Sequence, residues 1–366
     1  MPLAEFEQRL LGGGEPEWDV VLALTDWLPQ LMGDGILRDL SAAISDAPPP
    51  GWPDCWMSSL RGLQTDSAGR SFALPYHDGP EVLLYRRDLF DDPSEQTSFA
   101  SRFGRPLTLP SDWGQFREVA EHFSRPDEGR YGCLLAGAPD GHNNVYDFLL
   151  QLWSRGGDLF HPDGSSAVGD AVAVDSMNYL IELVTAGLTQ PDPRRDDSVA
   201  TGERYAAGEA AMMVNWSGYS AMADRVGSPT RGVSGCGPLP GGTGRESSVS
   251  LSVYWVLGVL ASSRHNALAY EFIRHATSPD MDRITARSGA TACRTSTWRD
   301  PEILAEFPFY AALEGAHSVA RTLPPLRSWA RLNGLLNDAV DAAHVGGDSS
   351  AALAACANAM DKESWT

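Results

Sequence analysis

Short apolar runs and longer amphipathic stretches alternate along most of the chain. The apolar runs bounded by turn residues predict buried strands, which fall at 18–24, 71–76, 82–86, 210–215 and, as the longest candidate, 249–260. Apolar positions at helical spacing predict helices at 3–11, 111–123, 146–155, 174–186, 266–276, 303–314, 329–343 and 350–360. Ser111 is the expected N-cap of the helix that it begins. Strands alternating with helices predict an α/β protein with mainly parallel sheets.

Length and charge narrow the class of protein. A chain of 366 residues is long enough for two or three domains. Its 48 acidic against 28 basic residues give a formal net charge of -20, which repels nucleic-acid phosphates and anionic membrane surfaces. No stretch approaches the ~18 uninterrupted apolar residues of a transmembrane helix. We therefore expect no nucleic-acid partner and no membrane span.

The sequence lacks the usual signatures of an active site. The five cysteines are dispersed without a CxxC pair, a pattern more typical of buried apolar positions than of a disulfide framework. No GxSxG, HExxH or GxxxxGK[ST] motif is present, and no histidine pair has metal-ligand spacing. The sequence does not exclude a catalytic pair of carboxylates such as glycosidases use, although nothing in it points to one. We expect no enzyme, no cofactor and no metal site.

Several ordered segments carry a family resemblance. WDVV at 18–21 and DGILRDL at 34–40 are followed by ALPY at 73–76 with LYRRDLF at 84–90, and by LPSDW at 109–113. Further along are YAAGEAAM at 205–212, ALAYEFI with a following SP at 267–279, and SGATACR with DPE at 288–302. In this order and spacing they resemble the extracellular solute-binding proteins of ABC sugar importers, the group that includes maltose-binding protein.

The resemblance implies a two-lobed periplasmic-binding-protein fold of the class II type, with three crossings between the lobes and a C-terminal helical segment. The crossings are expected near 107–110, near 249–252 and between about 299 and 315. On this basis residues 1–108 with 252–300 form the first lobe, 109–251 with 315–366 form the second, and 301–314 form the third crossing. Ligand would be trapped between the lobes by closure about a hinge.

Family members begin with a strand, a helix and a second strand that precede the helix predicted here at 3–11. The given sequence also shows no basic and apolar leader of a secretory signal. Either the start of the chain has been placed too late or this is a shortened member, and we favour the first interpretation. The resemblance implies a periplasmic or cell-surface location.

A sugar presents an apolar face and a rim of hydroxyls, which aromatic rings and polar side chains respectively bind. In the loops that the resemblance places beside the cleft, the candidate ligand-binding residues are Asp26, Trp27, Tyr76, His77, Asn143, Asn144, Trp216, Tyr254, Arg294 and Trp329. Asp26 and Arg294 are expected to bind hydroxyls, while Trp216 and Trp329 are expected to stack on the ring.

Each candidate has a structural alternative. Tyr254 and Trp255 alternate along a strand, so only one can face the cleft, and we favour Tyr254. His77 is equally well explained as a loop residue that forms a hydrogen bond. Asn143 and Asn144 precede a helix, where N-cap chemistry explains them at least as well. For Trp216 and Trp329, stacking on the ligand and packing in the core explain the residue equally well.

The predicted function is the substrate-binding component of an ABC importer, a monomer whose partners are a small carbohydrate ligand and the permease subunits. One alternative is an intracellular relative that serves as an enzyme or a sensor. Another is the same scaffold binding a different solute, such as a polyamine or a peptide, because polyamine sites surround aromatic rings with acids.

Overall fold

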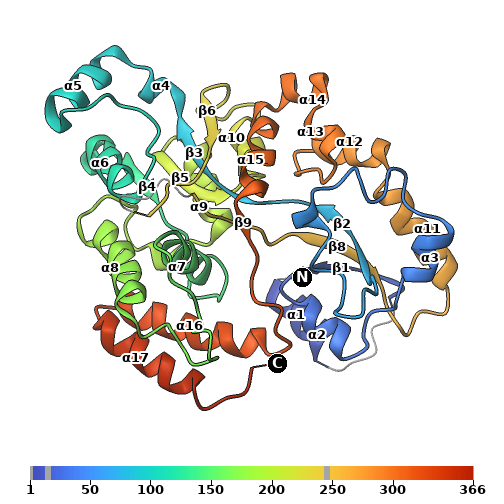
Figure 1. The fold of residues 1–366 in the computed structure, drawn as a ribbon. Coiled ribbons are helices and arrows are strands. Elements are labelled where there is room, and N and C mark those ends of the chain that lie inside the picture. The colour runs from blue at the N-terminus through green and yellow to red at the C-terminus, as the bar shows by residue number, and fades with distance from the viewer. Residues whose placement is uncertain (1–2, 13–17, 243–247, 366) are drawn as a thin grey trace.

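The computed structural model describes residues 3–12, 18–242 and 248–365, and it is a two-lobed α/β fold (Figure 1). The first lobe is built on a three-stranded sheet in the order β1-β8-β2, and the second on a four-stranded sheet in the order β4-β5-β3-β6. Their strands are β1 (Val20–Leu24), β2 (Ala73–His77), β3 (Glu81–Arg86), β4 (Tyr131–Leu134), β5 (Ala210–Trp216), β6 (Ser234–Gly237) and β8 (Trp255–Val259).

The prediction of mainly parallel sheets is wrong. The pairs β1–β8, β2–β8, β3–β5 and β3–β6 are antiparallel, whereas β4–β5 is parallel. The reason is that β8 returns from the second lobe and enters the middle of the first sheet, where it runs opposite to both neighbours. The hydropathy pattern cannot report this, because a strand buried on both faces shows the same apolar run in either direction.

Three chain segments lie side by side between the lobes. Two-residue strands β7 (Ser250–Leu251) and β9 (Ala320–Arg321) pair in parallel, and Pro80 forms a bridge with Ser252. Pro80 belongs to the turn between β2 of the first sheet and β3 of the second. These segments are where the chain passes from one sheet to the other.

The predicted lobe boundaries remain a proposal, which the pairings revise. Because β3 is hydrogen-bonded within the second sheet, we place the first crossing at 78–80 rather than at 107–110. We keep the second crossing near 249–252 and place the third at β9, after the predicted 301–314.

Helices surround both sheets, some packed on a sheet and others on neighbouring helices. They are α1 (Leu3–Leu11), α2 (Leu28–Gly33), α3 (Ser41–Asp46), α4 (Arg87–Phe90), α5 (Pro93–Phe103), α6 (Trp113–Phe123), α7 (Asn143–Ser154), α8 (Ala171–Thr185), α9 (Ser198–Ala206), α10 (Tyr219–Ala223), α11 (Asn266–Ala276), α12 (Pro279–Arg287), α13 (Thr295–Trp298), α14 (Pro301–Glu306), α15 (Leu313–Ser318), α16 (Trp329–His344) and α17 (Ser349–Met360). The chain ends on the second lobe, where α16 packs on α7 and α8, and α17 packs on α8 and α16 (Figure 1). None of the helices in the described ranges is long and apolar enough to cross a membrane.

Local sequence explains most of these helices, with three corrections. The N-cap of α6 is Asp112, whose carboxylate accepts from Gln115 N at 2.9 Å, and not Ser111. The predicted helix at 303–314 is broken, because Pro308 cannot donate to the preceding turn and starts a 3-10 helix at 308–312. The predicted strand at 249–260 is divided into β7 and β8 around the crossing.

Candidate functional site

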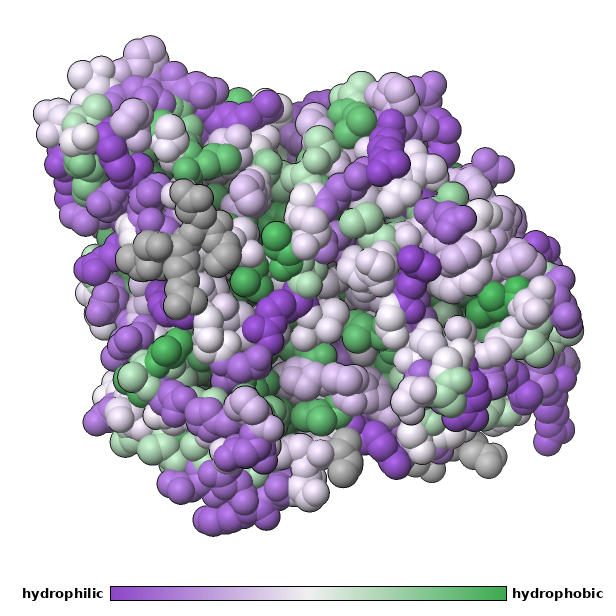
Figure 2. All heavy atoms as spheres, in the orientation of Figure 1, coloured by the Kyte–Doolittle hydropathy of each residue, from purple (hydrophilic) through white to green (hydrophobic). Residues whose placement is uncertain are grey.

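A cavity of about 1210 Å³ lies between the lobes and takes residues from both. The first lobe contributes the ends of its strands, including Leu24, His77 and Trp255, and the second contributes Tyr146 and Trp216. Figure 2 shows the surface indented between the two lobes at the upper edge of the molecule. We call this space the large cavity.

A second space of about 250 Å³ lies beside the loop that precedes α7, and we call it the small cavity. Asp140 and His142, in the loop before α7, line both cavities. The remaining wall of the small cavity comes from α1, from the loop after β1 and from α16, with Glu7, Leu11, Asp26, Trp27, Gln30, Trp329, Asn333 and Asn337. Segments distant in sequence therefore converge on this space.

Aromatic rings face the large cavity from both lobes. Trp216 ends β5, and its ring meets Tyr146 edge-on with centroids 5.9 Å apart and an interplanar angle of 82°. Trp255 begins β8, and its ring meets Trp27 edge-on at 6.1 Å and 85°. Trp216 and Trp255 are both half-buried, so part of each indole stays open to the cavity. Such edge-on contacts fix ring orientation while leaving a face for a ligand.

One hydrogen bond joins the lobes beside the small cavity. Tyr146 Oη donates to Asp26 Oδ2 at 3.3 Å, and Asp26 Oδ1 is buried without a partner among the described residues. Burial raises the pKa of Asp26, while the nearby His142 and the Tyr146 hydroxyl oppose that rise. Burial also raises the pKa of Tyr146, so its hydroxyl stays a donor at neutral pH.

The asparagines at the start of α7 have different roles. Asn144 Nδ2 donates to Asn337 Oδ1 at 2.8 Å, and Gly141 N donates to the same oxygen at 3.1 Å. Asn333 Nδ2 in turn donates to Gly141 O at 2.6 Å. These contacts hold the loop before α7 against α16, so Asn144 serves the scaffold, whereas Asn143 lines the large cavity.

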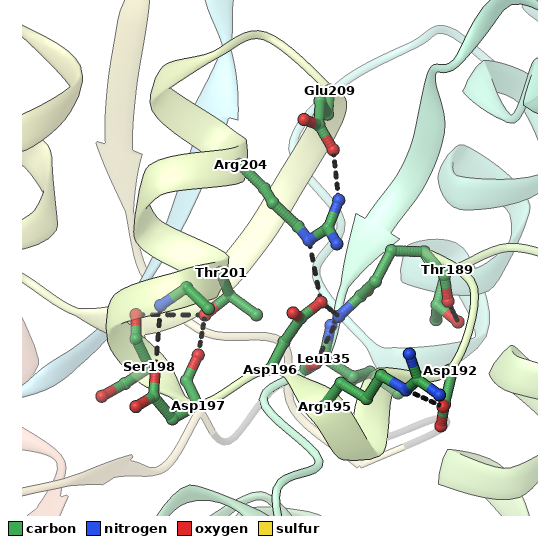
Figure 3. Close-up of polar contacts among 12 residues, drawn as sticks. Leu135, Thr189, Asp192, Arg195, Asp196, Asp197, Ser198, Thr201, Arg204 and Glu209 are labelled. Carbon is green, nitrogen blue, oxygen red and sulfur yellow. Dashed lines mark hydrogen bonds and ion pairs between the residues drawn. The ribbon is translucent and has the colours of Figure 1, made fainter.

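Arg204 anchors another wall of the large cavity. Its guanidinium donates to Asp196 Oδ2 at 2.8 Å and to Glu209 Oε2 at 2.7 Å (Figure 3). Gln190 Nε2 donates to the same Asp196 oxygen at 3.1 Å. Because Asp196 directly precedes residues 197–199, which line the cavity, the network fixes the position of that edge.

The structure places five of the predicted residues against the cavities in addition to Asn143. His77 and Trp216 line the large cavity, and Asp26, Trp27 and Trp329 line the small one. Trp27 and Trp329 are each only 3% exposed. Their contact with a ligand remains a proposal, as does that of the other candidates.

Three other predicted residues are directed elsewhere. Tyr254 is fully buried, and its hydroxyl donates to Gln64 Oε1 at 2.9 Å, so Trp255 faces the cavity instead. Tyr76 lines neither cavity and packs against the apolar cluster between the first sheet and its covering helices.

Arg294 is 1% exposed and lines neither the large cavity nor the small one. Its guanidinium donates to Thr277 O at 2.8 and 2.6 Å and to Pro50 O at 2.7 Å. It also lies 4.0 Å from the ring centroid of Trp56. Arg294 therefore holds loops of the first lobe together, because its hydrogen bonds to Thr277 O and Pro50 O join segments of that lobe.

Sequence reasoning missed several cavity residues that helical spacing could have found. Asn333 and Asn337 follow the predicted Trp329 at intervals of four residues on one face of α16. His142 and Tyr146 repeat the same spacing, and their rings meet edge-on at 6.0 Å. Glu7 had no signal, because it is one of two acids on an amphipathic helix.

Two pairs of buried ionisable residues lie at or next to the first crossing between the lobes. Asp78 in the first crossing and His317 in α15 are joined by a 2.7 Å contact between Oδ2 and Nε2, and both side chains are fully buried. Glu81, the first residue of β3, is 1% exposed, and neither of its carboxyl oxygens has a partner within the part of the chain that the structure describes. Burial and the nearby Asp147 raise the pKa of Glu81 well above its usual value, and burial raises that of Asp147 to about 8.

Two lobes joined by side-by-side crossings, with aromatic and polar groups in a cavity between them, define a two-lobed binding protein. The profile of the bacterial extracellular solute-binding proteins matches residues 4–282. The chain belongs to this family.

Individual relatives are distant in sequence. A probable amino-acid ABC transporter periplasmic-binding protein of Sinorhizobium fredii, y4oP, is 25% identical over 246 residues, which are 65% of this chain and 53% of that protein. A probable ABC transporter-binding protein of Deinococcus radiodurans is 24% identical over 90% of this chain and 75% of its own length. A mannitol-binding protein of Pseudomonas aeruginosa is 24% identical over 74% of this chain and 64% of its own length. The match thus spans about half of y4oP.

Solved structures share the fold. Maltose-bound MalE3 of T. maritima superposes with a TM-score of 0.85 at 23% identity, covering 98% of this chain and 88% of that chain. A solute-binding protein of Agrobacterium radiobacter K84 in complex with ribitol superposes with a TM-score of 0.86 at 21% identity and the same coverage. These likenesses confirm the predicted two-lobed architecture.

Proposed function

We propose that the protein captures a sugar or polyol between its lobes as the substrate-binding component of an ABC importer. The observation that carries the proposal is the pair of indoles, Trp216 and Trp255, that line the large cavity from opposite sheets. Indole faces cover the apolar C–H face of a sugar. Polar groups of His77, Asn143 and His142 line the same cavity and can bind hydroxyls at the rim.

The crossings provide a mechanism for capture. Short strands and a single bridge, rather than a broad sheet, connect the lobes, so closure needs rotation at only a few residues. In the closed form the ligand contacts both lobes, and its binding energy favours that form over the open one. The difference between open and closed forms is what permease subunits would recognise.

Relatives and structural neighbours named for mannitol, maltose and ribitol support a hydroxyl-rich ligand. The family description supports a place outside the cytoplasmic membrane. We extend the proposal to a monomer that binds its ligand without transforming it.

A ligand screen tests this proposal. Maltose, mannitol, ribitol and related sugars are added to the protein, and unfolding is followed by differential scanning fluorimetry and binding by calorimetry. A true ligand at about 100 times its dissociation constant adds about 2.7 kcal/mol to the free energy of unfolding.

Substitution assigns the binding to the large cavity. Trp216→Ala removes a cavity ring and is expected to weaken binding at least about tenfold, as loss of a central aromatic contact does. Trp365→Ala is the matched control, because Trp365 is a half-buried tryptophan that lines neither cavity and donates to Met360 O. Failure of every sugar and polyol to bind contradicts the proposal.

A further inference from the structure

The small cavity carries an excess of negative charge. Glu7, Asp26 and Asp140 line it, together with the guanidinium of Arg327 and the imidazole of His142, whose Nδ1 lies 3.8 Å from Asp140 Oδ1. Arg327 is already paired with Asp34, a carboxylate that does not line the cavity. The cavity therefore holds more carboxylates than its own basic groups neutralise.

Asp26 is the carboxylate of this set that the protein leaves incompletely partnered. Asp26 has one oxygen bound to Tyr146 and the other buried without a partner among the described residues. Burial raises the pKa of both Asp26 and Glu7, and the proximity of Asp26 adds to the rise at Glu7. The nearby His142 opposes the rise in both. A carboxylate in this condition gains when an external cation reaches it.

Two indole N–H groups provide an independent sign of a ligand. Trp27 and Trp329 both line the small cavity, and each is only 3% exposed. The indole Nε1 of each is buried and has no hydrogen-bond partner among the described residues. Buried N–H donors without partners are rare in native proteins, and a ligand oxygen is a common reason for them. Asn333 adds an unpartnered buried oxygen, Oδ1, on the same wall.

The arrangement combines acids, aromatic rings and free donors around a space of about 250 Å³, the volume of roughly eight water molecules in the liquid. Aromatic faces beside carboxylates also favour cations through the ring quadrupole. A neutral sugar satisfies the two indole donors with its hydroxyl oxygens but leaves the excess charge of the carboxylates uncompensated.

We propose that the ligand is an aminated sugar or amino-polyol whose ammonium group enters the small cavity and binds Asp26, while its hydroxyl oxygens accept from the indoles of Trp27 and Trp329. This inference rests on the proposed function and narrows its ligand class. The rest of the ligand extends toward the large cavity, which shares Asp140 and His142 with the small one as lining residues.

Matched pairs of ligands test it. Sorbitol is compared with 1-amino-1-deoxysorbitol, and glucose with glucosamine, by calorimetry at pH 7; N-acetylglucosamine serves as an uncharged nitrogen control. The amine of each pair is expected to bind at least tenfold more tightly than its neutral partner, and N-acetylglucosamine is expected to lack this gain. In Asp26→Asn the ratio of the two affinities is expected to fall to near one.

Asp175→Asn is the matched control, because Asp175 is an exposed carboxylate on α8 that lines neither cavity, and it leaves the ratio unchanged. If neutral members bind as tightly as their amines, or if Asp26→Asn keeps the preference, the amine inference is overturned and the proposed sugar binding stands. If no member of any pair binds, the proposed function itself fails, and the inference fails with it.

Discussion

Tyr146 of the second lobe donates its hydroxyl to Asp26 of the first, across 3.3 Å. Asp26 stands just beyond the end of β1, and Tyr146 lies in the first turns of α7. The bond exists only while the lobes are together, so it contributes to the closed form and not to the open one. The same tyrosine ring positions Trp216, which couples closure to the aromatic wall of the large cavity.

Tyr146→Phe tests this relationship. The change removes the hydroxyl but keeps the ring, so ligand affinity is expected to fall about fivefold, which corresponds to one hydrogen bond of about 1 kcal/mol. Small-angle scattering without ligand is expected to show a larger radius of gyration for Tyr146→Phe than for the unmodified protein. Tyr179→Phe is the control, because its hydroxyl donates to Trp113 O within the second lobe and its loss affects stability only.

Trp255 and Tyr254 offer a contrast between neighbours in sequence. Trp255→Ala opens the first-lobe side of the large cavity, and ligand affinity is expected to fall at least about tenfold. Tyr254→Phe leaves Gln64 Oε1 without its donor and is expected to cost about 1–3 kcal/mol of stability with affinity nearly unchanged. Calorimetry measures ligand affinity and urea unfolding measures stability in both variants, which tests whether Trp255 faces the cavity while Tyr254 serves the fold. A loss of affinity in Tyr254→Phe alone contradicts it.

The contrast also shows how far sequence reasoning reached. The alternation of side chains along a strand correctly predicts that only one of the two residues faces the cleft. It does not say which one, because the strand is apolar on both faces. The direction of β8 was lost for the same reason. Helices with a clear polar face, such as α11, were predicted with the correct ends.

Contacts between distant segments account for the other differences. The resemblance of the SGATACR segment, which Arg294 ends, predicts a hydroxyl binder. The partners of Arg294 are instead Thr277 O and Pro50 O, backbone atoms that no side-chain pattern reveals. The small cavity needs α1, the loop after β1 and α16 together, and their meeting depends on how the lobes dock. Residue types near the cleft were predictable from the sequence, whereas their orientation was not.

The buried pair Glu81 and Asp147 predicts how stability depends on pH. In the unfolded chain both carboxyls ionise near pH 4, whereas in the folded protein burial raises both pKa values, that of Asp147 to about 8. The folded state then holds more protons than the unfolded state, so the free energy of unfolding falls as pH rises between these values. Above the folded pKa values the contribution of the pair is constant.

Urea unfolding at pH 7.0 and 8.5 measures this effect. The interval avoids the opposing histidines, His77, His122 and His344, whose pKa values are lowered by burial and whose effect is complete by about pH 7. We expect a loss of about 1 kcal/mol over the interval, and a flatter profile in Glu81→Gln, which keeps the shape of the side chain without its charge. A slope in Glu81→Gln equal to that of the unmodified protein contradicts the assignment.

Asp78 and His317 join the first crossing to α15. Their side chains are fully buried, and the other imidazole nitrogen, Nδ1, lies 2.9 Å from Ser59 Oγ. Asp78→Asn or His317→Gln alone leaves a buried polar partner unmatched, and each is expected to destabilise the protein by about 3–5 kcal/mol. A double-mutant cycle by urea unfolding is expected to give a coupling energy of at least about 1 kcal/mol. Additive losses would show that the two residues act independently.

Gly141 tests whether the loop before α7 sets the shape of both cavities. Its φ of +77° is costly for other residues, and a Cβ there would lie 2.9 Å from Asn333 Nδ2. Gly129→Ala is a matched control, because its φ is +70° but nothing lies within 4 Å of the added atom. Both variants are expected to lose about 1–2 kcal/mol of stability from backbone strain. Gly141→Ala alone must also displace Asn333, which donates to its carbonyl, and so move Asp140 and His142 at the junction of the two cavities. Ligand affinity is therefore expected to fall in Gly141→Ala and to persist in Gly129→Ala, and equal affinities in the two variants would show that the loop does not shape the site.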